Sequence, residues 1–183
     1  MKTLFFVSCA LFCLAALIPT SARAQAGDAE DPLEAITNYV KISDHLSTSG
    51  QIAYDQVEAI KEAGFEVVVN LAPARDDVNG LEGYMVVEQG MSYVHIPVSW
   101  QNPSQRDLQL FFDVMKANQD RKVFVHCFAN MRVSAFVYLY RTLHQNVPHE
   151  QARADLEKIW KPEELAQWDA FIKTAQREHD AGS

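Results

Sequence analysis

The spacing of apolar and polar residues divides the chain into alternating strands and helices. Three runs, at 65–71, 91–97 and 122–125, predict strands, and the first, with almost no polar alternation, is typical of a strand buried on both faces of a parallel sheet. Apolar residues that recur every three or four positions predict helices between and after these runs. The predicted helices are 32–38, 54–63, 81–89, the stretch after Ser104, 133–143, and two stretches opened by Pro148 and Pro162. Shorter extended pieces are predicted at 40–42 and 46–50.

Local signals support these boundaries and suggest a fold class. Gly64 and Gly90 directly follow two predicted helices, where glycine commonly ends a helix. Ser104 and Asp107 have the spacing of a helix N-cap. Because strands alternate with helices, the pattern predicts one α/β domain at 40–183, after an N-terminal segment at 25–39. We expect a central, mostly parallel sheet flanked by helices and joined by right-handed crossovers.

The first 24 residues have the order of a secretory signal peptide. A basic start at Lys2 precedes an apolar run from Leu4 to Ile18, and Ala-Arg-Ala at 22–24 has the pattern of a cleavage site. The alternative is a membrane anchor, but the run is short for a span of about 20 residues. We therefore expect a periplasmic or secreted protein that has no stable membrane insertion after cleavage of 1–24.

The net charge and the cysteine content limit the kinds of binding partner and of metal site that the protein can have. The net charge is −8, and loss of Lys2 and Arg23 with the signal peptide would make it −10. An acidic protein is not attracted to nucleic acids or to anionic membranes, so we expect neither as a partner. Of the three cysteines only Cys127 would remain, which leaves no pair for an internal disulfide and no set of thiolates for a metal. We expect no metal and no cofactor.

The candidate chemistry lies around Cys127. A predicted buried strand ends at His126, and a predicted helix begins near Arg132. Unpaired backbone amides at a helix N-terminus bind anions and favour the thiolate form of a nearby cysteine. Cys127 could then attack phosphorus, while Arg132 and the loop amides hold the non-bridging oxygens and Ser134 helps the thiolate leave. The loop residues that would supply these amides are Phe128, Ala129, Asn130 and Met131.

Each candidate also has a simpler interpretation. Cys127 could be a buried, inert thiol, and Arg132 could pair with a surface carboxylate. His126 could tune the thiolate, or it could fill the end of the strand through hydrogen bonds. Asn130 suits a structural role because asparagine tolerates left-handed backbone angles. Ser134 could be an ordinary serine in the first turn of a helix.

This arrangement of strand, His-Cys, loop, Arg and helix resembles the protein tyrosine phosphatase and dual-specificity phosphatase superfamily. Two upstream stretches, 45–71 and 93–115, are similar to the strands, helices and acid-loop region of its small bacterial members. The likeness covers 40–146 and extends to the phosphatase-like domains found with β-lactamase-like hydrolases. It implies a cysteine-phosphatase fold that hydrolyses a phosphomonoester such as phosphotyrosine, on a small molecule or a phosphoprotein, through a cysteinyl phosphate.

The loop departs from the pattern of this family in length. The phosphatase motif has five residues between Cys and Arg, whereas four separate Cys127 from Arg132, and Val133 precedes Ser134. Some bacterial phosphatase-like domains share this short spacing, which is also the length found in rhodanese-type sulfurtransferases. The first alternative function is therefore sulfur transfer through a persulfide on Cys127.

The general acid is missing from its usual place. The family carries an aspartate in the loop that corresponds to 98–102, where this chain has Val-Ser-Trp-Gln-Asn. Asp107 falls inside a predicted helix, and Asp76 and Asp77 in the 73–80 loop are candidate substitutes. Without an acid, a second alternative is a catalytically inactive domain that binds only an anion or a partner.

Overall fold

The computed structural model describes residues 31–182. The predicted signal peptide at 1–24 and residues 25–30 of the predicted N-terminal segment lie outside the described residues. Among residues 31–182, no helix is both long enough and apolar enough to cross a bilayer.

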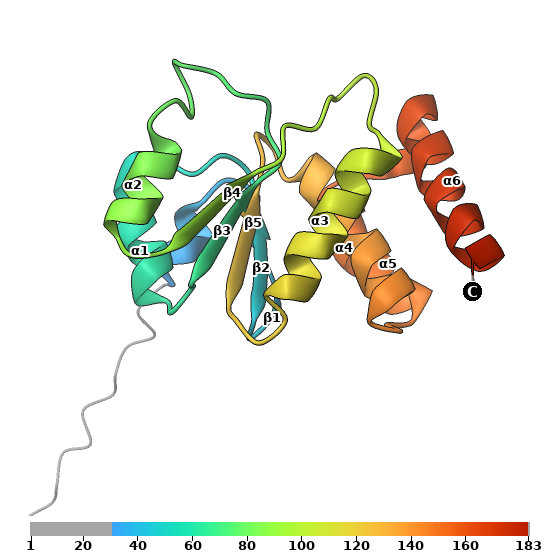
Figure 1. Cartoon of the computed structure of the whole chain (residues 1–183), viewed down its shortest axis with the longest axis horizontal. Coiled ribbons are helices and arrows are strands. Elements are labelled where there is room, and N and C mark those ends of the chain that lie inside the picture. Colours follow the sequence, from blue (N-terminus) through green and yellow to red (C-terminus); the bar gives the residue numbers. More distant parts are fainter. Residues whose placement is uncertain (1–30, 183) are drawn as a thin grey trace, which may run out of the picture.

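A five-stranded mixed sheet forms the centre of the molecule (Figure 1). Its strands, in spatial order, are β1 (Val40–Ser43), β2 (Leu46–Ser49), β5 (Val123–His126), β3 (Val67–Asn70) and β4 (Ser92–His95). β1 runs antiparallel to β2, and all other neighbouring strands are parallel. The predicted mostly parallel sheet is therefore confirmed, with an antiparallel strand at one edge.

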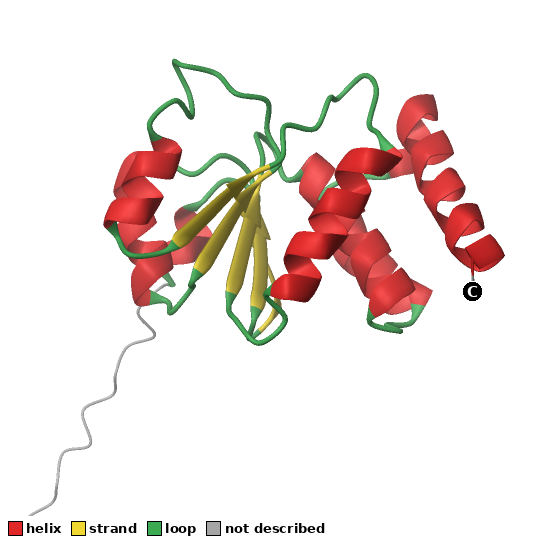
Figure 2. Ribbon diagram, viewed as in Figure 1, coloured by secondary structure: helices red, strands yellow, loops and turns green. Residues whose placement is uncertain are grey.

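Helices cover both faces of the sheet and complete a three-layer α/β domain (Figures 1 and 2). The smaller layer contains α1 (Val57–Glu62) and α2 (Glu82–Glu88). The larger layer contains α3 (Gln105–Ala117), α4 (Met131–His144), α5 (His149–Glu157) and α6 (Ala166–Gly182). Three short 3-10 helices, Pro32–Ala35, Tyr54–Gln56 and Pro162–Glu164, precede or connect these elements. The predicted flanking by helices is confirmed.

The sheet separates two hydrophobic cores because its central strands are apolar on both faces. Val67 and Val69 of β3 lie in the larger core, on the side of α3 to α6. Val68 of β3 and Phe124 of β5 lie in the smaller core, on the side of α1 and α2. Helix α4 is buried at every position from Arg132 to Arg141, so the helix predicted at 133–143 lies in the centre of the domain.

The local signals are confirmed, although several elements are shorter than predicted. Gly64 and Gly90 have φ angles of 85° and 74°, the left-handed conformation that glycine adopts most readily. The hydroxyl oxygen of Ser104 accepts a hydrogen bond from the amide of Asp107 at 3.1 Å. The helix predicted at 32–38 is only the 3-10 turn Pro32–Ala35, because Ile36 already has an extended backbone with ψ of 134°.

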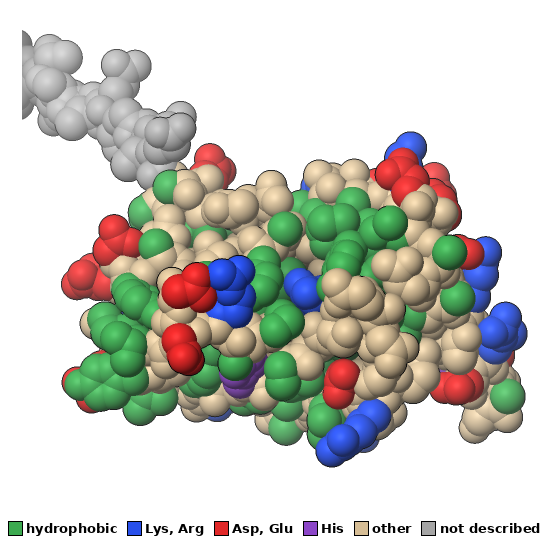
Figure 3. Space-filling view, turned by 90° about the horizontal axis from the view of Figure 1, so that it is seen from above, with side chains coloured by type: hydrophobic (Ala, Val, Ile, Leu, Met, Phe, Trp, Pro, Cys, Tyr) green, Lys and Arg blue, Asp and Glu red, His purple; other side chains and the backbone are tan. Residues whose placement is uncertain are grey.

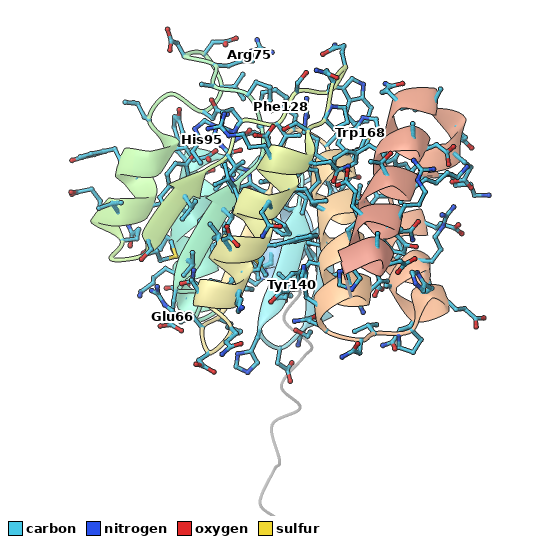
Figure 4. All side chains as sticks on the ribbon, turned by 45° about the vertical axis from the view of Figure 1, so that its right-hand side comes forward. Glu66, Arg75, His95, Phe128, Tyr140 and Trp168 are labelled. Carbon is cyan, nitrogen blue, oxygen red and sulfur yellow. The ribbon has the colours of Figure 1, made fainter. Side chains whose placement is uncertain are left out.

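The parallel strands end together at one edge of the sheet, and this edge holds the candidate site. Ser49 and Asn70 are both in register with His126, so the strand ends lie side by side. Figure 4 shows Phe128 near this edge, with Arg75 above it, whereas Glu66 and Tyr140 lie toward the opposite end of the strands. In parallel α/β sheets, ligands bind at the carboxyl ends of the strands.

Candidate active site

Cys127 lies at the first position after β5, at the base of a tight loop. Its side chain is 0 % exposed, and its amide donates to the carbonyl oxygen of Ser49 at 3.3 Å. The loop turns into α4 at Asn130, whose φ of 63° is the left-handed angle predicted for it. The side-chain amide of Asn130 donates to the carbonyl oxygen of Asn38 at 2.8 Å and to the hydroxyl of Thr48 at 3.0 Å. Asn130 therefore has the predicted structural role.

The carbonyl groups of the first half of the loop are bound from outside it. The carbonyl oxygen of Phe128 accepts from the amide of Gln51 at 3.1 Å. That of Ala129 accepts from the side-chain amide of Asn38 at 3.2 Å. Gly50 allows this close approach, because a Cβ there would lie 3.0 Å from the Phe128 carbonyl oxygen.

The carbonyl groups of the second half are bound in the same way. The amide of Ser134 donates to the carbonyl oxygen of Asn130 at 2.8 Å. The indole N–H of Trp160 donates to the carbonyl oxygen of Met131 at 3.0 Å. All four loop carbonyls are thus satisfied, and none is left to repel an anion.

Three of the amides of the same loop residues have no such partners. Among residues 31–182, no group accepts a hydrogen bond from the backbone N–H of Phe128, Ala129 or Met131, whereas the antiparallel bridge between Gly50 and Ala129 directs the N–H of Asn130 to the carbonyl group of Ser49. Unpaired amides at a loop that leads into a helix are the elements of an oxyanion site. The loop between β5 and α4 therefore has three amides available for an anion, and the binding of a phosphate there stays a prediction.

Arg132 supplies a buried positive charge at the start of α4. It is 8 % exposed, and its Nε donates to the carbonyl oxygen of Val98 at 3.0 Å. The guanidinium carbon lies 5.3 Å from the ring centroid of Trp100 and 5.8 Å from that of Phe128. No carboxylate of the described chain lies within ion-pair distance of Arg132, so the surface ion pair considered as an alternative is wrong. Its two terminal nitrogens are available for an anion.

Three tryptophans pack together beside Arg132 and hold the 98–102 loop in place. The ring centroid of Trp100 lies 5.1 Å from that of Trp168 and 5.5 Å from that of Trp160. The indole N–H of Trp168 donates to the carbonyl oxygen of Trp100 at 3.0 Å. This loop, where the family carries its general acid, is therefore anchored by an aromatic side chain. We call Trp100, Trp160 and Trp168 the tryptophan cluster.

Ser134 lies in the first turn of α4, but its hydroxyl is engaged elsewhere. It donates to the carbonyl oxygen of Met131 at 3.1 Å and lies 3.1 Å from the indole nitrogen of Trp160. A hydroxyl has only one hydrogen to donate. The role of Ser134 in helping the Cys127 thiolate to leave stays a prediction.

His126 contacts a buried carboxylate that the sequence analysis missed. Its side chain is 0 % exposed, and Nε2 lies 2.8 Å from Oε1 of Glu82, which is equally buried. The same carboxylate accepts from the side-chain amides of Asn70 at 2.8 Å and Gln51 at 2.5 Å, and from the hydroxyl of Tyr93 at 2.9 Å. We call Glu82, His126, Asn70, Tyr93 and Gln51 the carboxylate network.

The electrostatics of this network favour an ionised Glu82. Burial alone would raise the pKa of Glu82, but the interactions with His126, Tyr93 and Gln51 outweigh it and keep that pKa below its ordinary value. Burial, followed by the charge of Glu82, raises the pKa of the Tyr93 phenol, so Tyr93 stays neutral and donates. One signal in the sequence pointed to Glu82, since it shares the inward face of α2 with Val86.

The 73–80 loop lies over the Cys127 loop. The guanidinium carbon of Arg75 is 5.9 Å from the ring centroid of Phe128, and Arg75 pairs with the carboxylate of Asp77 at 2.7 Å. This hydrogen bond lowers the pKa of Asp77, which disfavours it as a proton donor at neutral pH. Asp76 lies exposed on the same loop. Figure 3 views this edge of the sheet from above, with Lys or Arg side chains near the middle of the face and hydrophobic side chains around them.

No group of three or more His, Cys, Asp or Glu side chains in residues 31–182 could hold a metal ion. The chemistry available to the described site is that of a buried thiol, unpaired amides and a guanidinium.

Comparisons with known proteins point to phosphatases. A family model described as a DSP-PTPase phosphatase fused to NAD+ kinase matches residues 25–174. The structure of a putative phosphatase (DUF442) from Shewanella putrefaciens CN-32 has 35% sequence identity and a TM-score of 0.70, covering 81% of this chain and 97% of that one. No curated protein matches the chain.

More distant structures share the fold. TpbA of P. aeruginosa has 14% identity and a TM-score of 0.63, covering 79% of this chain and 90% of its own. A TpbA variant in complex with pTyr has 16% identity and a TM-score of 0.61, covering 82% of this chain and 90% of its own.

Proposed function

Because this chain belongs to the DSP-PTPase phosphatase family, we propose that it hydrolyses phosphomonoesters through a cysteinyl phosphate on Cys127. The observation that carries this proposal is the loop from Phe128 to Met131, whose carbonyls are all bound from outside while the amides of Phe128, Ala129 and Met131 have no partner among the described residues. Arg132 adds a buried cation with no carboxylate partner among the described residues. Such a site is complementary to the equatorial oxygens of a phosphoryl group.

The reaction would proceed in two displacement steps. The Cys127 thiolate attacks phosphorus, an S–P bond forms, and the bond to the leaving oxygen breaks with its electron pair remaining on that oxygen. The loop amides and Arg132 stabilise the charge of the phosphoryl oxygens in the transition state. Water then attacks phosphorus and breaks the S–P bond, which releases phosphate and restores the thiolate.

Aryl phosphates are the substrate class that this site suits best. The 98–102 loop has no carboxylate to protonate the leaving oxygen, and Asp77 is held ionised by Arg75. A phenolate leaves without prior protonation far more readily than an alkoxide does. The complex of a TpbA variant with pTyr supports phosphotyrosine, on a small molecule or a phosphoprotein, as the natural substrate.

The two alternative functions have less support. The family match and the similar structures are phosphatases, and they give no support to a persulfide-based sulfurtransferase or to a purely binding domain. The short spacing from Cys127 to Arg132 is compatible with an anion site in which every loop carbonyl has an external donor.

We also propose that the protein acts in the periplasm or outside the cell. The order of a basic start, an apolar run and Ala-Arg-Ala at 22–24 supports export and cleavage after Ala24. Expression of the full chain, followed by cell fractionation and N-terminal sequencing, tests this. An exported protein that starts at Gln25 is expected, and an uncleaved protein in the cytoplasm would contradict it.

Hydrolysis of para-nitrophenyl phosphate tests the enzymatic proposal. We expect activity in the full chain, inhibition by vanadate, and no activity in Cys127→Ser with an unchanged unfolding temperature. Activity that survives Cys127→Ser would overturn the assignment of the nucleophile. Formation of thiocyanate from thiosulfate and cyanide, without phosphatase activity, would favour the sulfurtransferase instead.

A further inference from the structure

Two guanidinium groups lie over the ring of Phe128. The carbon of one, in Arg132, is 5.8 Å from the ring centroid and belongs to the proposed phosphate site. The carbon of the other, in Arg75, is 5.9 Å from the same centroid and has no role in the proposed reaction. We propose that Arg75 is a specificity-determining residue that binds a second anionic group of the substrate, such as a carboxylate. This inference rests on the proposed function, because it takes the first anionic group to be a phosphate held at Cys127 and Arg132.

The backbone of the 73–80 loop holds Arg75 in place. The backbone amide of Arg75 donates to the side-chain oxygen of Asn79 at 2.7 Å, and its carbonyl oxygen accepts from the amides of Val78 at 3.1 Å and Asn79 at 2.9 Å. Asn79 is buried, and its side-chain amide donates to the carbonyl oxygen of Pro73 at 3.1 Å. A loop that is already ordered by internal hydrogen bonds loses less conformational entropy when it binds a ligand. Arg75 is therefore preorganised.

The guanidinium of Arg75 is oriented by one carboxylate but keeps free donors. Its Nε and Nη2 donate to the two carboxylate oxygens of Asp77 at 3.2 and 2.7 Å, and Nη1 has no partner among residues 31–182. A guanidinium that binds a carboxylate along one edge still has N–H groups on another edge for a second anion. The side chain is 53% exposed, so a substrate can reach it.

The positions of the two guanidinium groups suit a substrate of the size of phosphotyrosine. Because both carbons lie over one ring, their separation cannot exceed the sum of their distances to its centroid. Figure 4 shows Arg75 above Phe128 at the edge of the sheet that holds the site. An aryl phosphate whose carboxylate is attached to the ring through a short chain can reach both groups, with its own ring near that of Phe128.

The charge of the remaining chain makes the expected preference specific to Arg75. The net charge is −8, and Asp76 and Asp77 lie on the same loop as Arg75. These charges disfavour a substrate that carries an additional anionic group. A preference for such a substrate therefore requires a nearby cation besides Arg132, and Arg75 supplies it.

The first test compares two aryl phosphates that differ only in charge, para-(phosphonooxy)phenylpropionate and its neutral amide. The ratio of their kcat/KM values measures the preference for the carboxylate. We expect the wild type to prefer the carboxylate and Arg75→Gln to lower this ratio by about fivefold or more. Arg177→Gln is the matched control, because it removes an equal charge from an exposed position of α6. An unchanged ratio in Arg75→Gln, or an equal fall in Arg177→Gln, would overturn the inference.

Asp77→Asn should change the same ratio in the opposite direction. Asparagine keeps an oxygen acceptor beside Arg75 but removes the negative charge that competes with the substrate carboxylate. The ratio should therefore rise, by about twofold or more. A fall in Asp77→Asn would overturn the proposed electrostatic attraction.

Phosphotyrosine peptides separate two sources of the second anionic group. The peptides carry either glutamate or glutamine next to the phosphotyrosine, and their kcat/KM values are compared in the wild type and in Arg75→Gln. A preference for glutamate that depends on Arg75 assigns the anion to a phosphoprotein. A preference that is confined to the pair of small aryl phosphates assigns it to a small molecule.

Binding measurements separate this inference from the proposed function. Calorimetry with Cys127→Ser gives the affinities for the two small aryl phosphates without turnover. Tighter binding of the carboxylate, lost when Arg75→Gln is added, supports the role of Arg75 even where the wild type is inactive, and that inactivity overturns the proposed function alone. Hydrolysis without a preference for the carboxylate overturns the role of Arg75 alone, and failure to hydrolyse or bind either compound overturns both.

Discussion

Two kinds of side chain flank the Cys127 loop, and they stabilise it by different physics. On the side of α2, the carboxylate network contains a buried acid and a buried base 2.8 Å apart. On the side of α6, the tryptophan cluster contains no charge, and its rings are 5.1 to 5.8 Å apart. The carboxylate network includes His126, the residue before Cys127, and the tryptophan cluster contacts Arg132.

The carboxylate network therefore affects the charge near the loop, whereas the tryptophan cluster affects the position of its side chains. A buried carboxylate such as that of Glu82 has a large desolvation cost, so it contributes little net stability but fixes a negative charge at a defined place. Packed aromatic rings contribute stability through buried area and hold the guanidinium by its faces. Variants of the network should therefore change the dependence on pH, whereas variants of the tryptophan cluster should change stability and catalysis at every pH.

The largest effect on stability is expected from Trp168→Ala. Trp168 is 0 % exposed and contacts both other tryptophans, so its loss leaves a large cavity. The free energy of unfolding in urea should fall by about 3–5 kcal/mol, equally at pH 6 and pH 8. Leu110→Ala is the control, because Leu110 is 44% exposed on α3 and its truncation should change stability by less than about 0.5 kcal/mol. A loss of stability that depends on pH would contradict the inference that the tryptophan cluster acts through packing and not through charge.

Arg132→Lys should have the next largest effect, this time on catalysis. A lysine keeps the charge, but it lacks the planar fork that bonds to the Val98 carbonyl and lies between two rings. The kcat/KM for para-nitrophenyl phosphate should fall by about 100-fold or more. Arg153→Lys, in an exposed ion pair on α5, should leave kcat/KM unchanged. Near-normal activity in Arg132→Lys would mean that charge alone suffices at this position.

The network should make a smaller contribution that varies with pH. The pKa of Glu82 is lowered in the folded protein, so its ionisation stabilises the fold above the ordinary value of 4.5. That contribution is lost as the pH falls through the lowered pKa. In urea titrations between pH 6 and pH 3, the wild type should therefore lose stability more steeply than Glu82→Gln. Parallel curves for the two proteins would show that Glu82 is not preferentially ionised in the fold.

The sequence could predict the elements whose signals are local. The buried strand, the His-Cys pair, the left-handed Asn130 and the start of α4 follow one another in the chain, and each depends on its immediate neighbours. The caps at Gly64 and Ser104 are equally local. These predictions are confirmed because backbone geometry and short-range hydrogen bonds determine them.

The carboxylate network could not be predicted in the same way. Glu82 is buried because polar side chains from four other segments converge on it, and a single sequence does not show that convergence. Its helix was also misleading, since Leu81, Tyr84 and Val87 are apolar but 58% to 62% exposed. The pattern of α2 therefore suggests an ordinary weak helix, whereas its inward face carries the acid of the site.

Ser134→Ala is expected to have the smallest effect. It tests the hydroxyl that contacts both the loop, at Met131, and the tryptophan cluster, at Trp160. The Ser134 hydroxyl donates to Met131 and lies next to the Trp160 indole nitrogen, which keeps its own bond to Met131 in the variant. Loss of one neutral hydrogen bond should lower kcat by less than about threefold. Rapid-quench measurements with an aryl phosphate give the decisive comparison. Accumulation of a cysteinyl phosphate in Ser134→Ala would mean that the hydroxyl rotates toward Cys127 and helps the thiolate to leave. The tryptophan cluster would then contact a catalytic hydroxyl through Trp160 as well as the Arg132 cation.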